Sequence, residues 1–249
     1  MRSSLIILFL CVSGISAAKG NKKANKFAAA LEPKLNDIIA SIASLSDDPE
    51  WELVFKAVAG IAPVGNTDKS LYDPVDVWSR DEPLNEDVPA ARKLDNSFKG
   101  HYKSQSALNW GRRNIMEVKV AFLDATGKEL MSMIFDGEGS NDVNWFTKAR
   151  LLYSPYDDIV SGSQNYFSVA GAHNRRFFIN RNYGGCEKHA GWMAVIGKNY
   201  CSWEYEQEAK PIFLYSTTRT YANWNKVEDV GRADLFAIFV KTKSRYCCN

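Results

Sequence analysis

Short segments rich in β-branched and aromatic residues recur from Trp51 to Val240, and clusters of glycine and asparagine separate them. No helical periodicity lies between these segments. Because strands at such spacing pack as antiparallel sheets, the pattern predicts a mainly β fold, an antiparallel β-sandwich or barrel-like domain. We expect strands at 51–58, 115–123, 129–135, 165–170, 176–180, 192–196, 211–215 and 233–240.

The connections between these segments are of two kinds. Residues 124–128, with Gly127 near the end, are typical of the turn of a hairpin that joins the second and third segments. Residues 60–109 carry prolines and many charges but few apolar runs, which predicts a long irregular region with one helical turn near 89–94.

The first eighteen residues have the three parts of a secretory signal peptide. Arg2 supplies a positive charge, Leu5 to Val12 form an apolar run too short to span a bilayer, and Ser16-Ala17-Ala18 suits signal peptidase. We therefore expect residues 1–18 to be removed and the mature protein to be secreted and extracellular, starting near Lys19. No later apolar stretch is long enough to predict a membrane span.

Residues 19–48 are expected to form a basic start followed by a short amphipathic helix. Apolar residues recur there at spacings of four and three, at Leu31, Leu35, Ile38, Ile42 and Leu45, and Ala28 and Ala24 extend the pattern back to residue 24. One interpretation is a coiled-coil seam for self-association. The other is a short helix from Pro33 to Leu45 that docks on the main domain, because proline prefers the first helical turn. A β-rich domain at 49–241 and a cysteine-containing tail at 242–249 complete the expected organisation.

Composition excludes some classes of partner. The chain has 31 Lys and Arg against 29 Asp and Glu, so no strong overall field steers it to nucleic acid.

Cysteine usage fits an oxidising compartment. Cys11 leaves with the signal peptide, and an even number remains: Cys186, Cys201, Cys247 and Cys248. Neighbouring cysteines rarely bond each other, which leaves two arrangements. Either Cys186 pairs with Cys201 and the C-terminal cysteines crosslink other chains, or the tail is bonded to both Cys186 and Cys201 without any partner chain.

No catalytic motif is present. The sequence has no nucleophile elbow, no zinc-protease motif and no phosphate-binding loop, and its histidines, His101, His173 and His189, lie in polar contexts. We therefore expect no catalytic residues, and a protein that acts by binding rather than as an enzyme.

The best cluster of oxygen ligands follows the segment at 129–135. Asp136, Glu138 and Asp142 alternate with small residues and would suit calcium, which takes several oxygens from flexible loops. A solvated turn uses the same residue types. We expect no resident cofactor, with calcium as the one candidate.

Tryptophans beside amide groups are candidates for sugar binding. Trp145 and Trp224 each have asparagine neighbours, so an indole face would lie next to hydrogen-bonding groups. The alternative is that both rings fill the core.

Blocks of residues from Trp51 onward resemble a family of secreted cnidarian and mollusc proteins. The resemblance rests on 51–60, 100–104, 135–146, 175–180, 183–186, 191–192, 201–204, 214–216 and 231–234. Some members resemble components of the organic matrix of coral skeleton or mollusc shell. The family brings no catalytic residues, and its pattern implies a local Cys186–Cys201 disulfide.

The resemblance implies a secreted, non-enzymatic protein of an extracellular or skeletal organic matrix that acts by binding, and the tail residues Cys247 and Cys248 would allow it to crosslink. Its partners would be matrix components, a mineral surface or a polysaccharide, with self-association through the seam and the tail cysteines. Unlike many mineral-matrix proteins, this chain is neither strongly acidic nor repetitive. The alternative function is a soluble glycan-binding or defence protein that uses calcium.

Overall fold

The computed structural model describes residues 50–61, 71–173, 175–205 and 208–243. The chain divides into two compact units at Pro49 and Glu50, and all described residues belong to the second. The expected signal peptide, the amphipathic helix and the tail cysteines Cys247 and Cys248 lie outside the described residues.

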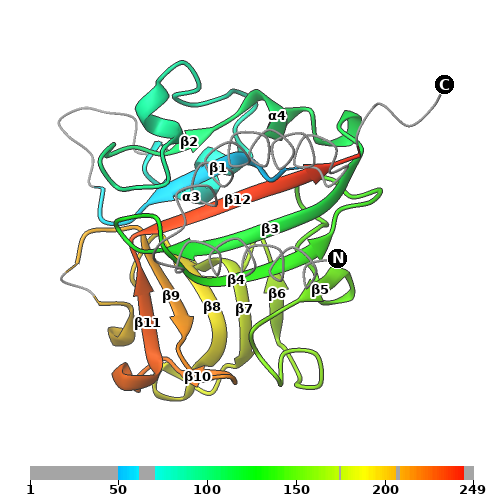
Figure 1. Cartoon of the computed structure of the whole chain (residues 1–249). Coiled ribbons are helices and arrows are strands. Elements are labelled where there is room, and N and C mark those ends of the chain that lie inside the picture. Colours follow the sequence, from blue (N-terminus) through cyan, green and yellow to red (C-terminus); the bar gives the residue numbers. More distant parts are fainter. Residues whose placement is uncertain (1–49, 62–70, 174, 206–207, 244–249) are drawn as a thin grey trace, which may run out of the picture. The chain divides into compact units, whose positions relative to one another are not determined.

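The first sheet has six antiparallel strands in the order β2-β1-β12-β3-β4-β5 (Figure 1). The first and last described strands pair along most of their length, from Glu52 with Val240 to Val58 with Leu235. The expected hairpin is β3 and β4, joined at 124–128. The bounds are β1 Glu52–Val58, β2 Tyr102–Lys103, β3 Ile115–Leu123, β4 Glu129–Asp136, β5 Leu151–Tyr153 and β12 Leu235–Thr242.

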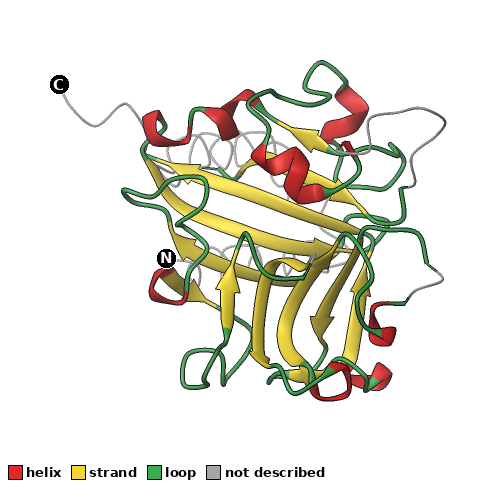
Figure 2. Cartoon of the chain, turned by 180° about the vertical axis from the view of Figure 1, so that it is seen from behind, coloured by secondary structure: helices red, strands yellow, loops and turns green. Residues whose placement is uncertain are grey.

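The second sheet has the order β11-β9-β8-β7-β6, and the two-residue strand β10 pairs with β8 beside β9. Its strands run across those of the first sheet in Figures 1 and 2. The bounds are β6 Tyr166–Ser168, β7 Arg175–Asn182, β8 Ala190–Ile196, β9 Ile212–Ser216, β10 Ala222–Asn223 and β11 Val230–Ala233.

An aromatic core joins the two sheets. Phe122 of β3 stacks on Phe213 of β9 with ring centres 6.0 Å apart, and Phe177 of β7 packs 4.8 Å from Phe236 of β12. Buried apolar side chains from both sheets belong to one cluster. The predicted mainly β fold with two packed antiparallel sheets is therefore confirmed.

The region predicted to be irregular, 60–109, is held by two buried lysines. Lys56 Nζ donates to the carbonyl of Lys93 at 2.6 Å, and Lys103 Nζ donates to the carbonyl of Trp78 at 2.5 Å. An ammonium group is costly to bury unless its donors are satisfied, and backbone carbonyls satisfy them here. The region and the residues that directly follow it contain short helices, shown in red in Figure 2, that sequence patterning missed apart from the turn at 89–92: α3 Pro74–Ser79, η2 Pro89–Arg92, α4 Gln105–Leu108 and η3 Trp110–Arg112.

Candidate functional site: a cationic groove beside β8

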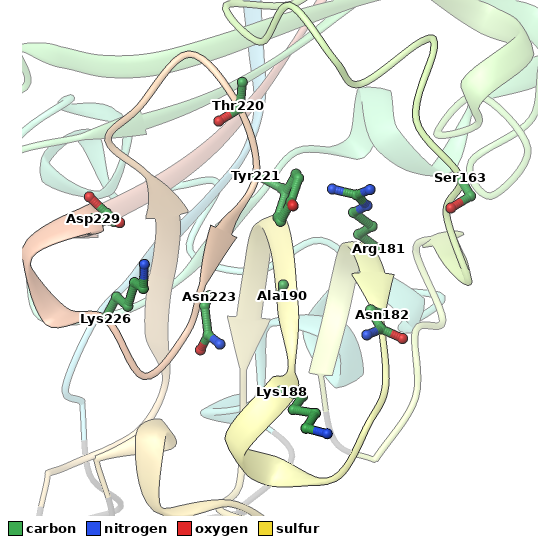
Figure 3. A pocket seen from close by; sticks show the side chains of 10 residues that line it. All are labelled: Ser163, Arg181, Asn182, Lys188, Ala190, Thr220, Tyr221, Asn223, Lys226 and Asp229. Atoms are coloured by element: carbon green, nitrogen blue, oxygen red, sulfur yellow. The ribbon is translucent and has the colours of Figure 1, made fainter.

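A groove of about 800 Å³ lies over the beginning of β8 and its neighbours β7 and β10 (Figure 3). This volume is within the range of small-molecule sites in proteins. Most of the lining side chains are polar or charged: Ser163, Arg181, Asn182, Lys188, Ala190, Thr220, Tyr221, Asn223, Lys226 and Asp229.

The groove forms where β8 changes partner. Met193 to Ile196 pair with β9, whereas Ala190 and Gly191 pair with β10. Gly191 is required for the close approach of β7, because a Cβ there would lie 2.6 Å from the carbonyl oxygen of Ile179. The turn between β9 and β10 is fixed by Ser216, whose Oγ donates to the carbonyl of Thr220 at 2.6 Å. That turn delivers Tyr221 to the groove.

One wall is the segment after β10. The backbone N–H of Asn225 donates to Asn223 Oδ1 at 2.9 Å, and the N–H of Lys226 donates to the carbonyl of Asn223 at 2.9 Å. The N–H of Asp229 then donates to the carbonyl of Lys226 at 2.9 Å, within the turn η7, Val227–Asp229. Consecutive turns thus fix the backbone that carries Lys226 and Asp229.

A second, adjoining wall is the turn η5, Cys186–Lys188, which the disulfide Cys186–Cys201 ties to the segment between β8 and β9. Two amides join this turn to the first wall. Asn225 Nδ2 donates to the carbonyl of Cys186 at 2.8 Å, and Asn223 Nδ2 donates to the carbonyl of Glu187 at 3.2 Å. The disulfide therefore helps to position Lys188.

The charge of the groove is mainly positive. Arg181, Lys188 and Lys226 line it together with one carboxylate, Asp229. Within the described parts of the chain, none of the three cations has a carboxylate oxygen within 4 Å. The guanidinium carbon of Arg181 lies 3.9 Å from the centre of the Tyr221 ring, a cation–π contact that fixes both side chains.

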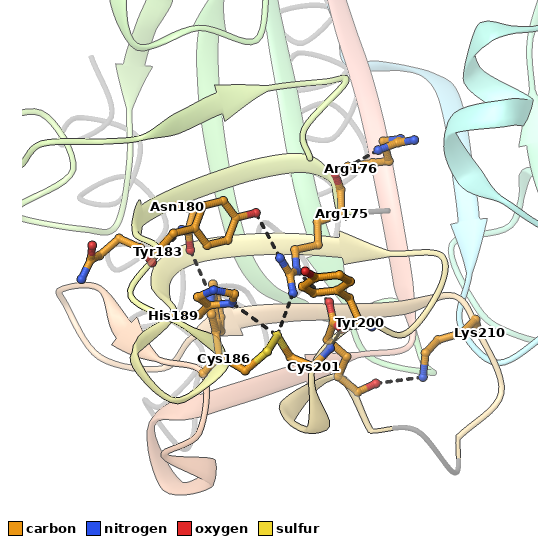
Figure 4. A network of polar contacts seen from close by, with 12 residues as sticks. Arg175, Arg176, Asn180, Tyr183, Cys186, His189, Tyr200, Cys201 and Lys210 are labelled. Atoms are coloured by element: carbon orange, nitrogen blue, oxygen red, sulfur yellow. Dashed lines mark hydrogen bonds and ion pairs between the residues drawn. A yellow bond between two sulfur atoms is a disulfide. The ribbon is translucent and has the colours of Figure 1, made fainter. Parts of the chain in front are cut away.

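A buried polar network lies behind the disulfide (Figure 4). Arg175 and Glu204 form an ion pair with Nε and Oε1 2.7 Å apart, and both side chains are fully buried. Arg175 also donates to Tyr183 Oη at 3.0 Å and approaches Cys201 Sγ at 3.3 Å. Glu204 accepts from the backbone N–H groups of Tyr200 and Cys201. The network gives both buried charges hydrogen-bond partners. It also positions Cys201, to which Cys186 of η5 is bonded.

The disulfide Cys186–Cys201 confirms the local pairing implied by the resemblance. Because each cysteine forms one disulfide, the arrangement in which the tail is bonded to both is wrong.

The two tryptophans predicted to bind sugar, Trp145 and Trp224, have their rings in the core, as the alternative interpretation expected. The two side chains are 0% and 1% exposed. Trp145 stacks on Trp110 with ring centres 5.9 Å apart, and Trp224 stacks on Trp203 at 5.8 Å. Their indole N–H groups are satisfied inside the protein, by the carbonyl of Asp142 and by Asn180 Oδ1. The asparagines beside these tryptophans reflect turns rather than an exposed ring.

Two of the three candidate calcium ligands, Asp136 and Glu138, use their carboxylates in ion pairs. Asp136 Oδ1 accepts from the N–H of Glu138 at 2.9 Å, and Asp136 pairs with Arg150 at 3.4 Å. Glu138 pairs with Lys243 at 2.8 Å. Asp142 is exposed, and its backbone carbonyl accepts from Trp78 Nε1 at 3.0 Å. In the described ranges, no group of three His, Cys, Asp or Glu residues is gathered as a metal site. The segment forms a turn, and calcium binding there stays a prediction.

Sequence reasoning missed the residues that line the groove. Arg181, Lys188 and Tyr221 stand in segments that resemble ordinary strand ends and turns. The sequence feature that came nearest to predicting the groove was the pair of asparagines around Trp224. Asn223 lines the groove, whereas Trp224 is buried.

Comparisons with known proteins found no matching family model, no matching curated protein and no matching solved structure. A search of the described residues for a helix that is long and apolar enough to cross a membrane also found none.

Proposed function

We propose that this chain is a secreted, non-enzymatic protein of an extracellular or skeletal organic matrix, and that it acts by binding polysaccharide in the groove beside β8. The observation that carries the proposal is the groove itself, in which polar side chains and an aromatic ring converge from separate segments. Carbohydrates present many hydroxyl groups and apolar C–H faces, so amides, hydroxyls and an aromatic ring are suitable contacts.

The side chains that would meet hydroxyl groups are available. Ser163 and Asn182 are exposed and make no side-chain hydrogen bond within the described chain. An amide can donate and accept at once, and a hydroxyl can do the same, which suits the mixed donors and acceptors of a sugar. Tyr221, 36% exposed, adds the aromatic surface.

The environments of the histidines support binding rather than catalysis. His101 is 1% exposed, and its Nδ1 accepts from the N–H of Val58 at 3.1 Å. Burial lowers the pKa of His101 to about 4. His189 is also buried, and burial together with Arg175 lowers its pKa to about 4. His173 is exposed and stacks on Tyr200 with ring centres 4.8 Å apart. A general base is most effective with a pKa near the working pH and a place beside the substrate.

The predicted signal peptide and the disulfide support an extracellular location, because disulfides persist in oxidising compartments. Crosslinking through Cys247 and Cys248, and self-association through the seam at 24–45, belong to the same proposal. Gels with and without reductant test the crosslinks: a single monomer band under both conditions would remove them from the proposal.

The test of the binding role is an oligosaccharide array probed with the secreted protein and with Tyr221→Ala. We expect binding by the unmodified protein and loss of binding by Tyr221→Ala. Tyr153→Ala, which removes an exposed tyrosine at the end of β5 and outside the groove, is the matched control and should bind normally. An array without any bound glycan would contradict the proposal.

The second candidate, a soluble lectin or defence protein, would use the same groove. Location separates the two, so we would search for the peptides in cleaned, dissolved mineral and in mucus or body fluid. Enrichment in mineral would support the matrix role, and abundance only in mucus or fluid would favour the lectin.

A further inference from the structure

We infer that the groove beside β8 selects an anionic polysaccharide, one that carries sulfate or carboxylate groups, over a neutral one. The inference rests on the binding role proposed above and adds the charge of the ligand to it.

The first argument is that the three cations converge from separate parts of the chain. Arg181 is on β7, Lys188 is in η5 and Lys226 follows β10, and all three line one groove. Figure 3 shows Arg181 and Lys226 on opposite sides of Ala190, with Lys188 below it. An anionic chain that crosses β8 would therefore meet positive charge from more than one wall.

The second argument is that none of these charges is neutralised by an ion pair within the described part of the chain. No carboxylate oxygen lies within 4 Å of Arg181, Lys188 or Lys226 in the described part of the chain. Elsewhere on the surface arginines do find carboxylates, as Arg219 does with Asp157 at 2.6 Å. Sulfate and carboxylate groups are the ligands that would complete the hydrogen bonding of such cations.

The third argument is that the backbone around the cations is held in place. Turns fix the segment of Lys226, and a disulfide with two amide hydrogen bonds fixes that of Lys188. The Tyr221 ring holds the Arg181 guanidinium. Less side-chain and loop freedom is lost when a ligand binds to groups that are already positioned.

One carboxylate, Asp229, also lines the groove, on the side away from Arg181 in Figure 3. It would repel an anionic group there and accept hydrogen bonds from sugar hydroxyls. The balance is three cations against one carboxylate. The whole chain, by contrast, has a net charge of only +2, so attraction to a polyanion would be local to the groove.

The experiment measures the dissociation constants of a heparin-derived hexasaccharide and of the neutral maltohexaose by calorimetry, with the secreted full chain. The test variant is Lys188→Gln/Lys226→Gln. The control variant is Lys99→Gln/Lys128→Gln, which removes the same charge from exposed positions outside the groove. Thermal unfolding of each variant reports whether the fold is intact.

We expect the hexasaccharide to bind the unmodified protein and the control with affinities that agree within about twofold, since isolated surface charges contribute little. The groove variant should bind it at least about tenfold more weakly, because charge-assisted hydrogen bonds are lost. Maltohexaose should bind much more weakly than the sulfated probe to all three proteins.

Three outcomes would overturn the inference. Equal losses in the groove variant and the control would mean general adsorption to a polyanion. Equal or tighter binding of maltohexaose, abolished by Tyr221→Ala, would leave the polysaccharide role standing without selection for charge. Failure of both sugars to bind, with capture by phosphatidylserine vesicles instead, would contradict the sugar role as well and indicate a membrane surface.

Discussion

Arg175 Nε lies 2.7 Å from Glu204 Oε1, and neither side chain is exposed to solvent. The guanidinium carbon of Arg175 also lies 4.7 Å from the centre of the Trp203 ring. Taking two charges out of water is costly, so the pair is tolerated because each charge also makes hydrogen bonds to neighbouring groups. We therefore expect that the loss of either partner lowers the stability of the second sheet around β7.

Replacement of Glu204 by Gln should strongly destabilise the protein. The change leaves the Arg175 charge buried without a counterion, and breaking a buried pair in this way costs about 3–5 kcal/mol of unfolding free energy. The measurement is chemical unfolding of the variant at neutral pH. Asp157→Asn breaks the exposed pair with Arg219 and is the control, which should unfold close to the unmodified protein. Equal stability of both variants would show that the buried pair contributes no more to the unfolding free energy than the exposed pair does.

Stability should decrease as the pH falls from 6.5 towards 4, in part because of His101. Burial, the largest effect, lowers the pKa of His101 to about 4, with Asp73 opposing and Lys56 reinforcing the shift. The unfolded chain, with a histidine pKa of about 6.5, binds the proton first, so this contribution is complete above pH 6.5 and is lost towards pH 4. The slope for one such histidine approaches about 1 kcal/mol per pH unit.

The check is the difference in unfolding free energy between pH 6.5 and pH 5 for the unmodified protein and for His101→Gln. The variant should show a smaller difference at the same temperature. His189 keeps part of the slope in the variant, because its pKa is also lowered to about 4. An unchanged pH dependence would mean that His101 is protonated equally in the folded and unfolded states.

The longer strands were predictable from the sequence because their own side chains carry the signal. β3 and β12 are eight or nine residues of mainly apolar and β-branched type, and the expected segments overlap both. The strands β2, β5, β10 and β11 have only two to four residues. Their pairing is determined by the neighbouring strands, so no local sequence pattern predicts them.

The groove could not be predicted from the sequence, and the reason is different. Its cations lie at positions 181, 188 and 226, and only the β7–β8–β10 pairing brings them together. Conversely, the asparagines that suggested an exposed Trp224 form turns around a ring buried against Trp203. Whether an aromatic ring is buried depends on tertiary packing, which residue neighbours along the chain do not determine.

Trp145 and Tyr221 should respond to truncation in opposite ways. Trp145→Ala removes a fully buried ring from the aromatic core and should lower the unfolding free energy by about 3–5 kcal/mol. Tyr221→Ala removes a partly exposed ring and should mainly reduce glycan binding. Unfolding and binding measurements on both variants separate the roles. Loss of glycan binding by a stably folded Trp145→Phe protein, with Tyr221→Ala unaffected, would restore the original interpretation of Trp145.

Removal of the disulfide should weaken both the fold and the groove. Cys186 and Cys201 are 15 residues apart in sequence, and a loop of that length corresponds to about 3 kcal/mol of stabilisation in the chain-entropy description. Cys186→Ala/Cys201→Ala should therefore unfold at lower denaturant concentration. Amide exchange should also speed up around Lys188, since η5 would keep its hydrogen bonds to Asn223 and Asn225 but lose its covalent link to Cys201. Reductant should reproduce these effects on the unmodified protein and leave the unfolding and the amide exchange around Lys188 in the variant unchanged. If the variant binds the sulfated hexasaccharide as tightly as the unmodified protein, the hydrogen bonds around η5 suffice to position the wall without the disulfide.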